Sequence, residues 1–286
     1  MAPGDITVAR SIEALREAVT AWRQRRERIG LVPTMGAIHA GHLALVRTAR
    51  GECERVVASL FVNPTQFAPT EDFAAYPRDE VADLAAFQAA GVDVVFMPSV
   101  AEMYPAGFST KVEVEGVSEG LDGDFRPGHF AGVATIVAKL LLQSLPDAAY
   151  FGEKDYQQLM VVRRLARDLD IPVAIEGVTT AREEDGLALS SRNAYLSPAE
   201  RRIAPLLYQV LRDTAAALAQ DPDAVAATLE RGIVRLRGGG FAVDYLELRA
   251  AATLAPMPRL AGPARLLAAV HLGRTRLIDN IEVAPA

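Results

Sequence analysis

Short runs of β-branched and other apolar residues alternate with stretches of helical periodicity along the first two-thirds of the chain. After Ser11, a typical helix cap, apolar residues recur at helical intervals at Ile12, Leu15, Val19 and Trp22. The runs predicted to be strands are residues 6–8, 29–33, 55–62, 92–97, 148–151 and 172–178. Each is separated from the next by enough chain for a crossover helix. The pattern therefore predicts an α/β fold, a Rossmann-like doubly wound parallel sheet with helices on both faces.

The pattern changes after about Thr179. Ser197, Pro198 and Glu200 combine a capping serine, a first-turn proline and a capping-box glutamate, so a helix is expected to start there. Another helix is expected after Asp221, followed by glycines at 238–240 and by strands at 241–248, 266–272 and 276–283. We expect a catalytic domain over residues 1–178 and a smaller α+β lid domain over 179–286, with a hinge near 179–185 that closes the lid over a ligand.

Composition and charge exclude several classes of protein. Half of the residues are hydrophobic and 23% are charged, which is typical of a globular chain and not of a disordered or low-complexity one. The 30 Lys and Arg against 36 Asp and Glu give a net charge of -6, so the molecule as a whole does not attract nucleic-acid phosphates. Cys53 is the only cysteine, which excludes an intramolecular disulfide and a cysteine-based zinc site.

Neither a targeting segment nor a membrane span is expected. Residues 1–5 contain no basic stretch followed by an apolar core, and Lys139 interrupts the most apolar helix-like run, residues 133–142. Together with the single cysteine, this indicates a cytoplasmic protein with no membrane or nucleic-acid partner.

The first chemical signal is the segment Pro-Thr-Met-Gly-Ala-Ile-His-Ala-Gly-His at residues 33–42, between a predicted strand and an amphipathic helix. The free N–H groups and the dipole at a helix start favour phosphate. Gly36 and Gly41 allow a ligand to approach the backbone, and His39 and His42 can add two donors. Alternatively, the two histidines cap the helix and touch no ligand. These ten residues alone do not decide between the two.

His39–His42 resembles the HIGH signature of the nucleotidyltransferases related to class I aminoacyl-tRNA synthetases. Further blocks narrow the resemblance to the pantoate–β-alanine ligase family: FVNPTQF at 61–67, YPR at 76–78, FGEKDYQQ at 151–158 and DGLALSSRN at 185–193. These blocks follow one another in the order that the family shows. After Leu196 the chain resembles the family mainly in its length and in its order of helices and strands.

The resemblance implies an ATP-dependent ligation in two steps. Pantoate's carboxylate attacks the α-phosphorus of ATP, pyrophosphate leaves, and the amine of β-alanine then attacks the acyl carbon of the bound pantoyl adenylate, giving pantothenate and AMP. Because a carboxylate must approach a polyanion, such a site needs cations and hydrogen-bond donors on the phosphates. Mg²⁺ as the cofactor that accompanies ATP, and a homodimer, are implied as well.

The resemblance also implies residue roles. Catalysis falls on His39, His42, Lys154 and Arg192, with His42 as the family's proton donor. Imidazole near neutral pH can be either a neutral donor or an acid, so the residue type leaves the protonation state of His42 open. The ATP-binding residues implied are Met35, Gly36, His39, Gly41, His42, Gly152, Lys154, Asp155, Ala181, Leu189, Ser190, Ser191 and Arg192. Leu189 and Ile38 replace the family's usual methionine and leucine with apolar side chains of similar volume.

For pantoate the resemblance implies Gln66 and Gln158, with Asn63 and Phe61 beside them, and Gln66 is also expected to bind β-alanine. Amides bind hydroxyl and carboxylate groups without adding a charge beside the triphosphate. No metal ligands are assigned, although Asp83 and Asp155 are acids that could approach magnesium. Three other features get no role in the site: the family-like block 126–130, His271, which we expect to be structural, and the basic cluster at 23–28, interpreted as a solvated helix end.

Two other functions remain open. A sister HIGH enzyme would transfer a nucleotidyl group and retain it in the product, and a nonenzymatic nucleotide sensor would keep only the fold. The intact histidines, Lys154 and Arg192 argue against the sensor. Pantoate-dependent exchange between ATP and pyrophosphate, with pantothenate and AMP formed once β-alanine is added, separates the ligase from both.

Overall fold

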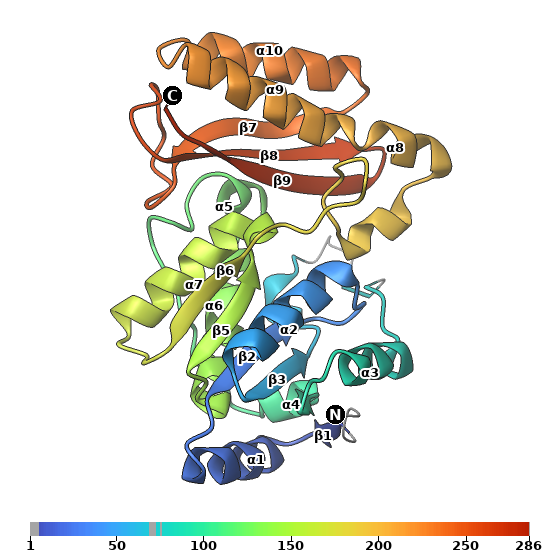
Figure 1. Cartoon of the computed structure of the whole chain (residues 1–286), viewed down its shortest axis with the longest axis vertical. Helices are drawn as coiled ribbons and strands as arrows, with labels where there is room; N and C mark the ends of the chain where they lie inside the picture. The colour runs from blue at the N-terminus through green and yellow to red at the C-terminus, as the bar shows by residue number, and fades with distance from the viewer. Residues whose placement is uncertain (1–5, 69–72, 75, 286) are drawn as a thin grey trace.

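The computed structural model describes residues 6–68, 73, 74 and 76–285, so the expectation placed on residues 1–5 lies outside the described part of the chain. Its larger sheet has six parallel strands in the order β1-β4-β3-β2-β5-β6 (Figure 1). The strands are β1 (Thr7–Ala9), β2 (Ile29–Thr34), β3 (Arg55–Leu60), β4 (Val94–Phe96), β5 (Ala148–Gly152) and β6 (Ala174–Val178). The predicted parallel sheet is confirmed, although several strands are shorter than their apolar runs.

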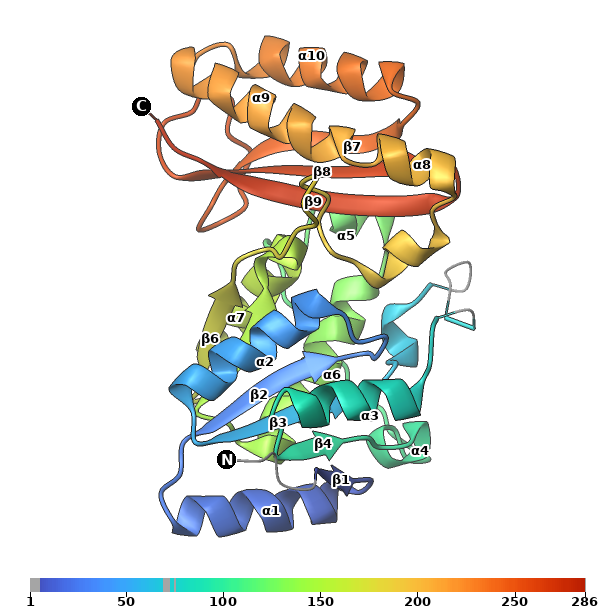
Figure 2. The ribbon, with the colours of Figure 1, turned by 45° about the vertical axis from the view of Figure 1, so that its right-hand side comes forward.

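Helices cover both faces of this sheet, as Figure 2 shows for α2 and α3 on the near face. They are α1 (Ile12–Gln24), α2 (Ala40–Glu52), α3 (Glu80–Ala89), α4 (Val100–Met103), α5 (Asp122–Phe125), α6 (His129–Ser144) and α7 (Tyr156–Asp168). Adjacent strand residues point to opposite faces. Leu31 and Val57 therefore join the apolar layer under α1, α6 and α7, whereas Val32 and Val56 join the layer under α2 and α3. Burial on both faces explains why the strands are continuously apolar.

The strand order reverses between β2 and β5. From β2 the chain moves outward through β3 and β4, and it then returns to pair β5 with β2 in register Gly30↔Ala148 and Leu31↔Ala149. In open parallel sheets, ligands bind in the crevice beyond the carboxyl ends of the strands at such a reversal. Here those ends are Thr34 and Gly152, which place the β2–α2 and β5–α7 connections side by side.

Three short 3₁₀ turns lie at this edge of the sheet or near it. They are η1 (Pro64–Gln66), η2 (Glu153–Asp155) and η3 (Ser191–Tyr195). Asn63 caps η1 by accepting the N–H of Thr65, and Ser190 caps η3 by accepting the N–H of Arg192. Two of the family-like blocks therefore form tight turns held by polar side-chain caps, whereas η2 has no side-chain cap.

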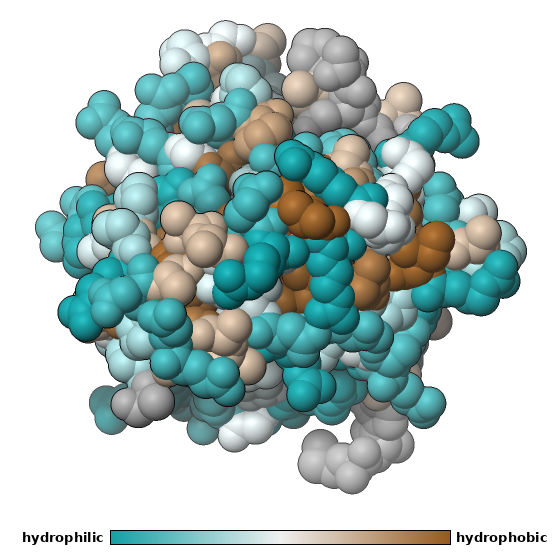
Figure 3. All heavy atoms as spheres, turned by 90° about the horizontal axis from the view of Figure 1, so that it is seen from above, coloured by the Kyte–Doolittle hydropathy of each residue, from teal (hydrophilic) through white to brown (hydrophobic). Residues whose placement is uncertain are grey.

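The rest of the chain forms an antiparallel sheet of β7 (Ala242–Ala250), β8 (Ala264–Leu272) and β9 (Thr275–Val283), together with α8 (Pro198–Ile203), α9 (Leu206–Gln220) and α10 (Val225–Gly238). The apolar sides of α9 and α10 pack on the sheet, and the face seen from above is mostly hydrophilic (Figure 3). The capping box of Ser197 and Glu200 is confirmed. The helix that it starts is short, because Pro205 has no N–H for the helical ladder and α9 begins after it.

The two sheets form separate layers of the molecule (Figure 1). The second, smaller α+β unit is thus confirmed as an architecture, and its proposed boundary falls at Val178, where β6 ends. Boundary, hinge and lid motion stay predictions. Among the described residues, no helix combines the length and the apolar character that crossing a membrane requires.

Candidate active site

A cavity opens beyond the carboxyl ends of β2 and β5. It is lined by the β2–α2 turn, the loop that follows β3, the start of α7, and residues 178–181 and 189–192. The structure brings together on its wall the predicted residues Met35, His39, Gly41, His42, Phe61, Asn63, Gln66, Gly152, Lys154, Asp155, Gln158, Ala181, Leu189, Ser190, Ser191 and Arg192. Segments that are far apart in the sequence therefore meet in one place. The role of each residue stays a prediction.

His39 and His42 hold the start of α2 in a reciprocal arrangement. The Nδ1 atom of His39 accepts the N–H of Gly41 at 3.1 Å, and the Nδ1 atom of His42 accepts the N–H of His39 at 3.4 Å. Because each Nδ1 accepts a hydrogen bond, each neutral ring carries its proton on Nε2. The histidines thus cap the helix and also line the cavity, so the two alternatives left open by the sequence hold together.

Burial keeps both rings neutral. Burial first, and then the neighbouring His39 and Lys154, which disfavour a second positive charge, together lower the pKa of His42 to about 3. The pKa of His39 is lowered mainly by burial and then by Lys154, and Asp155 opposes the change. Both imidazoles are therefore neutral Nε2–H donors near pH 7.

Gly36 shapes the turn that precedes the histidines. Its φ is +90°, a conformation that favours glycine, and a Cβ there would lie 2.9 Å from the Oδ2 atom of Asp83. Asp83 accepts the N–H groups of Ala37 and Ile38 at 3.0 and 2.8 Å. Neither Gly36 nor Asp83 is among the residues that line the cavity. The geometry gives Gly36 a part in this turn and gives Asp83 two backbone partners, and the contact of Gly36 with ATP stays a prediction.

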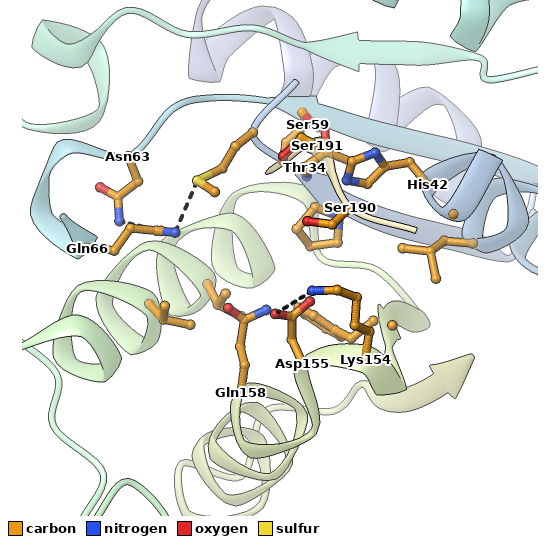
Figure 4. A pocket seen from close by; sticks show the side chains of 18 of the residues that line it. Thr34, His42, Ser59, Asn63, Gln66, Lys154, Asp155, Gln158, Ser190 and Ser191 are labelled. Atoms are coloured by element: carbon orange, nitrogen blue, oxygen red, sulfur yellow. Dashed lines mark hydrogen bonds and ion pairs between the residues drawn. The ribbon is translucent and has the colours of Figure 1, made fainter. Parts of the chain in front are cut away.

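Lys154 and Asp155 lie on η2, directly after β5, with the Nζ atom of Lys154 4.0 Å from Oδ1 of Asp155. The Lys154 side chain is 18% exposed and the Asp155 side chain 48%. Ser190, Ser191 and Arg192 face the same cavity from the segment that leads into α8 (Figure 4). Hydroxyls and cations from two segments thus surround one space, as binding of a polyphosphate requires.

Asn63 and Gln66 lie on the other side of the cavity (Figure 4). Asn63 is 1% exposed, and it donates to Oε1 of Gln66 at 3.0 Å and to the carbonyl of Gly132 at 3.1 Å. Its own Oδ1 accepts the hydroxyl of Tyr104 at 2.7 Å. These bonds leave the Nε2 of Gln66 directed at a weak acceptor, Sδ of Met35, at 3.1 Å. A ligand oxygen would be a stronger acceptor for that N–H group.

No role in the site was predicted for the 126–130 block, but the structure places two of its residues, Arg126 and His129, on the cavity wall. His129 binds the carbonyl oxygen of Gln66 through Nδ1 at 2.9 Å, and Arg126 binds its Nε2 at 3.0 Å. Because arginine can only donate, the His129 ring accepts at Nε2 and donates at Nδ1. His129 therefore positions the backbone of Gln66. In the sequence, the resemblance of this block to the family was the one signal that these residues belong to the site.

The structure also places His271 and the basic cluster at 23–28, two features for which no role in the site was predicted. His271 lies on β8, outside this cavity, with its Nε2 atom 3.4 Å from Oδ2 of Asp244. In the basic cluster, Arg25 pairs with Glu27 at 3.1 Å at the end of α1, and both are far from the cavity wall. Arg182, Asp279 and Asn280 had no motif to mark them, since their contacts join segments about a hundred residues apart.

The parallel sheet with its reversal point, the helix start with two histidines and the ring of cations together define a nucleotide-binding α/β enzyme of the HIGH class. A sequence model of the pantoate–β-alanine ligase family matches residues 7–282. The chain belongs to this family of ligases. The match favours the ligase over the sister nucleotidyltransferase and the nonenzymatic sensor.

Individual relatives agree with this assignment. The chain is 58% identical to a pantothenate synthetase of Paramagnetospirillum magneticum, with 98% of this chain and 99% of the relative covered, and 57% identical to that of Rhodospirillum rubrum, with 97% and 99% covered. It matches the crystal structure of a pantothenate synthetase from Thermus thermophilus with a TM-score of 0.92 and 51% identity, covering 98% and 100% of the two chains. A Francisella tularensis pantoate–β-alanine ligase, solved with a β,γ-ATP compound and β-alanine, gives a TM-score of 0.82 at 34% identity, covering 96% and 97%.

Proposed function

We propose that this chain joins pantoate to β-alanine at the expense of ATP, through an enzyme-bound pantoyl adenylate, using the cavity described above. The observation that carries the proposal is the division of the cavity wall: neutral Nε2–H donors and cations on one side, and neutral amides on the other. The complex of the Francisella relative with a β,γ-ATP compound and β-alanine supports the same pair of ligands for this chain.

In the first step a pantoate carboxylate oxygen forms a bond to the α-phosphorus of ATP, and the bond from that phosphorus to the bridging oxygen breaks to release pyrophosphate. His39 and His42 would donate Nε2–H to phosphate oxygens, and Lys154 and Arg192 would add positive charge. Such donors stabilise charge that develops in the transition state. Negative charge of a bound triphosphate would raise the histidine pKa values, and this would let His42 share or transfer its proton.

In the second step the amine of β-alanine forms a bond to the acyl carbon, and the bond from that carbon to the AMP oxygen breaks. Gln66 and Gln158 would hold the acid and the incoming amine, and Phe61 offers an apolar surface to pantoate's methyl groups. Neutral amides suit this role, because a cation would draw electrons from the attacking carboxylate. Holding the reactants in contact supplies the rest of the catalysis, and no covalent bond to the protein is needed.

Magnesium fits this site as a companion of ATP. No group of three His, Cys, Asp or Glu that could hold a metal ion occurs in the part of the chain that is described, whereas Asp155 offers one carboxylate at the cavity wall. Mg²⁺ typically keeps several waters and binds one or two carboxylates together with substrate phosphates. Bound with ATP, it would offset the charge of the phosphates.

The test is to supply ATP, Mg²⁺ and pantoate and to follow exchange of labelled pyrophosphate into ATP. We expect exchange with pantoate alone, and pantothenate with AMP in equal amounts once β-alanine is added. Exchange without pantoate, or tight ATP binding with no turnover, would contradict the proposal. The homodimer and the cytoplasmic location also stay proposals, and light scattering of the purified protein tests the first.

A further inference from the structure

Two segments on the phosphate side of the cavity, η2 and the loop that begins at Arg182, form hydrogen bonds with neighbouring residues of one strand in the smaller sheet. On β9, the amide Nδ2 of Asn280 donates to the carbonyl oxygens of Glu153 and Lys154, at 2.8 and 2.9 Å. The preceding residue, Asp279, receives both terminal nitrogens of Arg182, at 2.6 and 2.9 Å. One strand thus holds the turn that carries Lys154 and the loop that leads to Arg192.

The contacts of Asn280 fix the orientation of its amide. Its Oδ1 accepts NH1 of Arg265 at 3.1 Å, and arginine can only donate. The Nδ2 group must therefore face the two carbonyls of η2. Arg265 is held in turn, since its guanidinium lies 4.2 Å from the centre of the Tyr156 ring and pairs with Glu153 at 3.0 Å. The amide has no alternative orientation that keeps these bonds.

Arg182 is held equally firmly. Beyond its two bonds to Asp279, it donates to the carbonyl of Gly186 at 3.0 Å and lies 3.9 Å from the centre of the Tyr208 ring. Arg182 also pairs with Ala188 in a short antiparallel bridge. Anchoring Arg182 therefore anchors the base of the loop from which Leu189–Arg192 extend.

Burial makes the hydrogen bonds of Asp279 and Asn280 rigid. Asp279 and Asn280 are each 3% exposed, so water does not compete for their bonds. Burial raises the pKa of Asp279, and the bonds from Arg182 oppose that shift and favour the charged form. A bidentate arginine–carboxylate pair also fixes direction as well as distance.

We propose that Asp279 and Asn280 are positioning residues for adenylate formation, which set the separation between the Lys154 turn and the Ser190–Arg192 segment. The inference rests on the proposed function, and neither residue lines the cavity that holds the proposed reactants. Triphosphate contacts are needed in the first step and not in the second, because pyrophosphate has left by then. Loosening either attachment should therefore slow the first step selectively.

The variants are Asn280→Ala, which removes the donor to both carbonyls, and Arg182→Lys, which keeps the charge but loses the two-point bond to Asp279. Tyr245→Phe is the matched control, because it deletes a hydrogen bond between the two sheet units, 3.0 Å to Asp122, in which neither segment takes part. Each protein is assayed twice. Pantoate-dependent pyrophosphate exchange reports the first step, and release of AMP from chemically prepared pantoyl adenylate with β-alanine reports the second.

We expect exchange to fall roughly 10- to 100-fold in Asn280→Ala and by a smaller factor in Arg182→Lys, because misplacement of a charged group by about 1 Å has effects of this size. The second step should stay within about twofold of the parent in every variant. Equal losses in both steps, or exchange in Asn280→Ala as fast as in Tyr245→Phe, would overturn the inference. Absence of exchange in the parent protein would instead overturn the proposed function.

Discussion

The two sides of the cavity are built in different ways. On the amide side, Asn63 is buried and bonded to Gln66, Gly132 and Tyr104, so the wall exists before any ligand arrives. On the phosphate side, the rings of His39 and His42 form hydrogen bonds through Nδ1 to the described residues, and their Nε2–H groups would be available to a ligand. One side is an internal hydrogen-bond network, and the other is a set of donors that the substrate completes.

This structural difference predicts that the amide side contributes mainly to binding and the phosphate side mainly to catalysis. A prebuilt amide network costs little reorganisation when a small acid binds, so it should act on affinity and specificity. Donors aimed at a reacting phosphate gain strength as charge develops, so they should act on rate. Changes on the two sides should therefore fall on different kinetic constants, and the predictions below test that separation.

The largest effect is expected on the phosphate side. His42→Ala or Lys154→Ala should slow adenylate formation by about 10² to 10³, or about 2.7 to 4 kcal/mol, because each removes one donor that stabilises transition-state charge. Single-turnover formation of AMP measures it, with circular dichroism to show that the fold is kept. Lys111→Ala is the control, since Lys111 is exposed and pairs only with Glu113 in the described structure. Rates within threefold of the parent in the folded variants would refute the assignments.

The next effect is on the stability of the packing between α6 and η1, the turn that carries Gln66. At Gly132 on α6 a Cβ would lie 2.4 Å from the carbonyl oxygen of Thr65, so Gly132→Ala should lower the free energy of unfolding by about 1 to 3 kcal/mol. Gly51→Ala on α2 is matched to it, because a Cβ there meets nothing within 4 Å, and should raise the stability by a few tenths to about 1 kcal/mol. Urea unfolding measures both. Equal stabilities of the two variants would mean that α6 and η1 can move apart freely.

A smaller effect is expected for the amides themselves. Gln66→Ala and Gln158→Ala should each raise the KM for pantoate about tenfold, or about 1.4 kcal/mol, and leave the Kd for ATP within twofold. Steady-state kinetics and calorimetric ATP titration give the two constants. Gln209→Ala, on the exposed surface of α9, serves as the control. A loss of ATP affinity that equals the loss of pantoate affinity would remove the separation between the two sides.

The smallest effect is on pH-dependent stability. His42 has its pKa lowered to about 3 in the folded protein, well below the ordinary histidine value near 6.5. The unfolded chain therefore binds a proton that the folded one does not, and stability is full above about pH 6.5 and falls as the pH drops toward 3, by at most about 1.4 kcal/mol per pH unit. Urea unfolding between pH 7 and 5.5 should show a shallower decline for His42→Gln than for the parent. Identical slopes would contradict the neutral, buried ring.

Much of the fold could be predicted because local patterns and the overall architecture agree. Buried strands such as β2 and β3 are continuously apolar, and the capping box at Ser197 marks α8. The predicted helix after Ser197 missed the break at Pro205 and the separate α9, since a proline near a helix start is compatible with one helix or two. The predicted strand ends at residues 61–62 ran too far, because apolar character continues into a loop whose Phe61 is buried.

Side-chain partners were harder to predict than elements. The motif around His39 and His42 offered phosphate binding and helix capping as alternatives, but it gave no sign that the rings cap α2 and line the cavity at the same time. Gly36 belongs to the turn held by Asp83, a partner more than forty residues away, and the motif alone gave no sign of that partner. Arg182 and Asp279 are ordinary in their local sequence, and only the fold brings them within hydrogen-bond distance.

The most direct measurement is to follow the carboxylate oxygen of pantoate through the reaction. With pantoate labelled by ¹⁸O in its carboxylate, the account predicts that one labelled oxygen appears in the phosphate of AMP, because attack on the α-phosphorus transfers it and the amine then breaks the bond to carbon. Mass spectrometry of the AMP decides the question. Pantothenate formed together with unlabelled AMP would show that no pantoyl adenylate arises in this cavity.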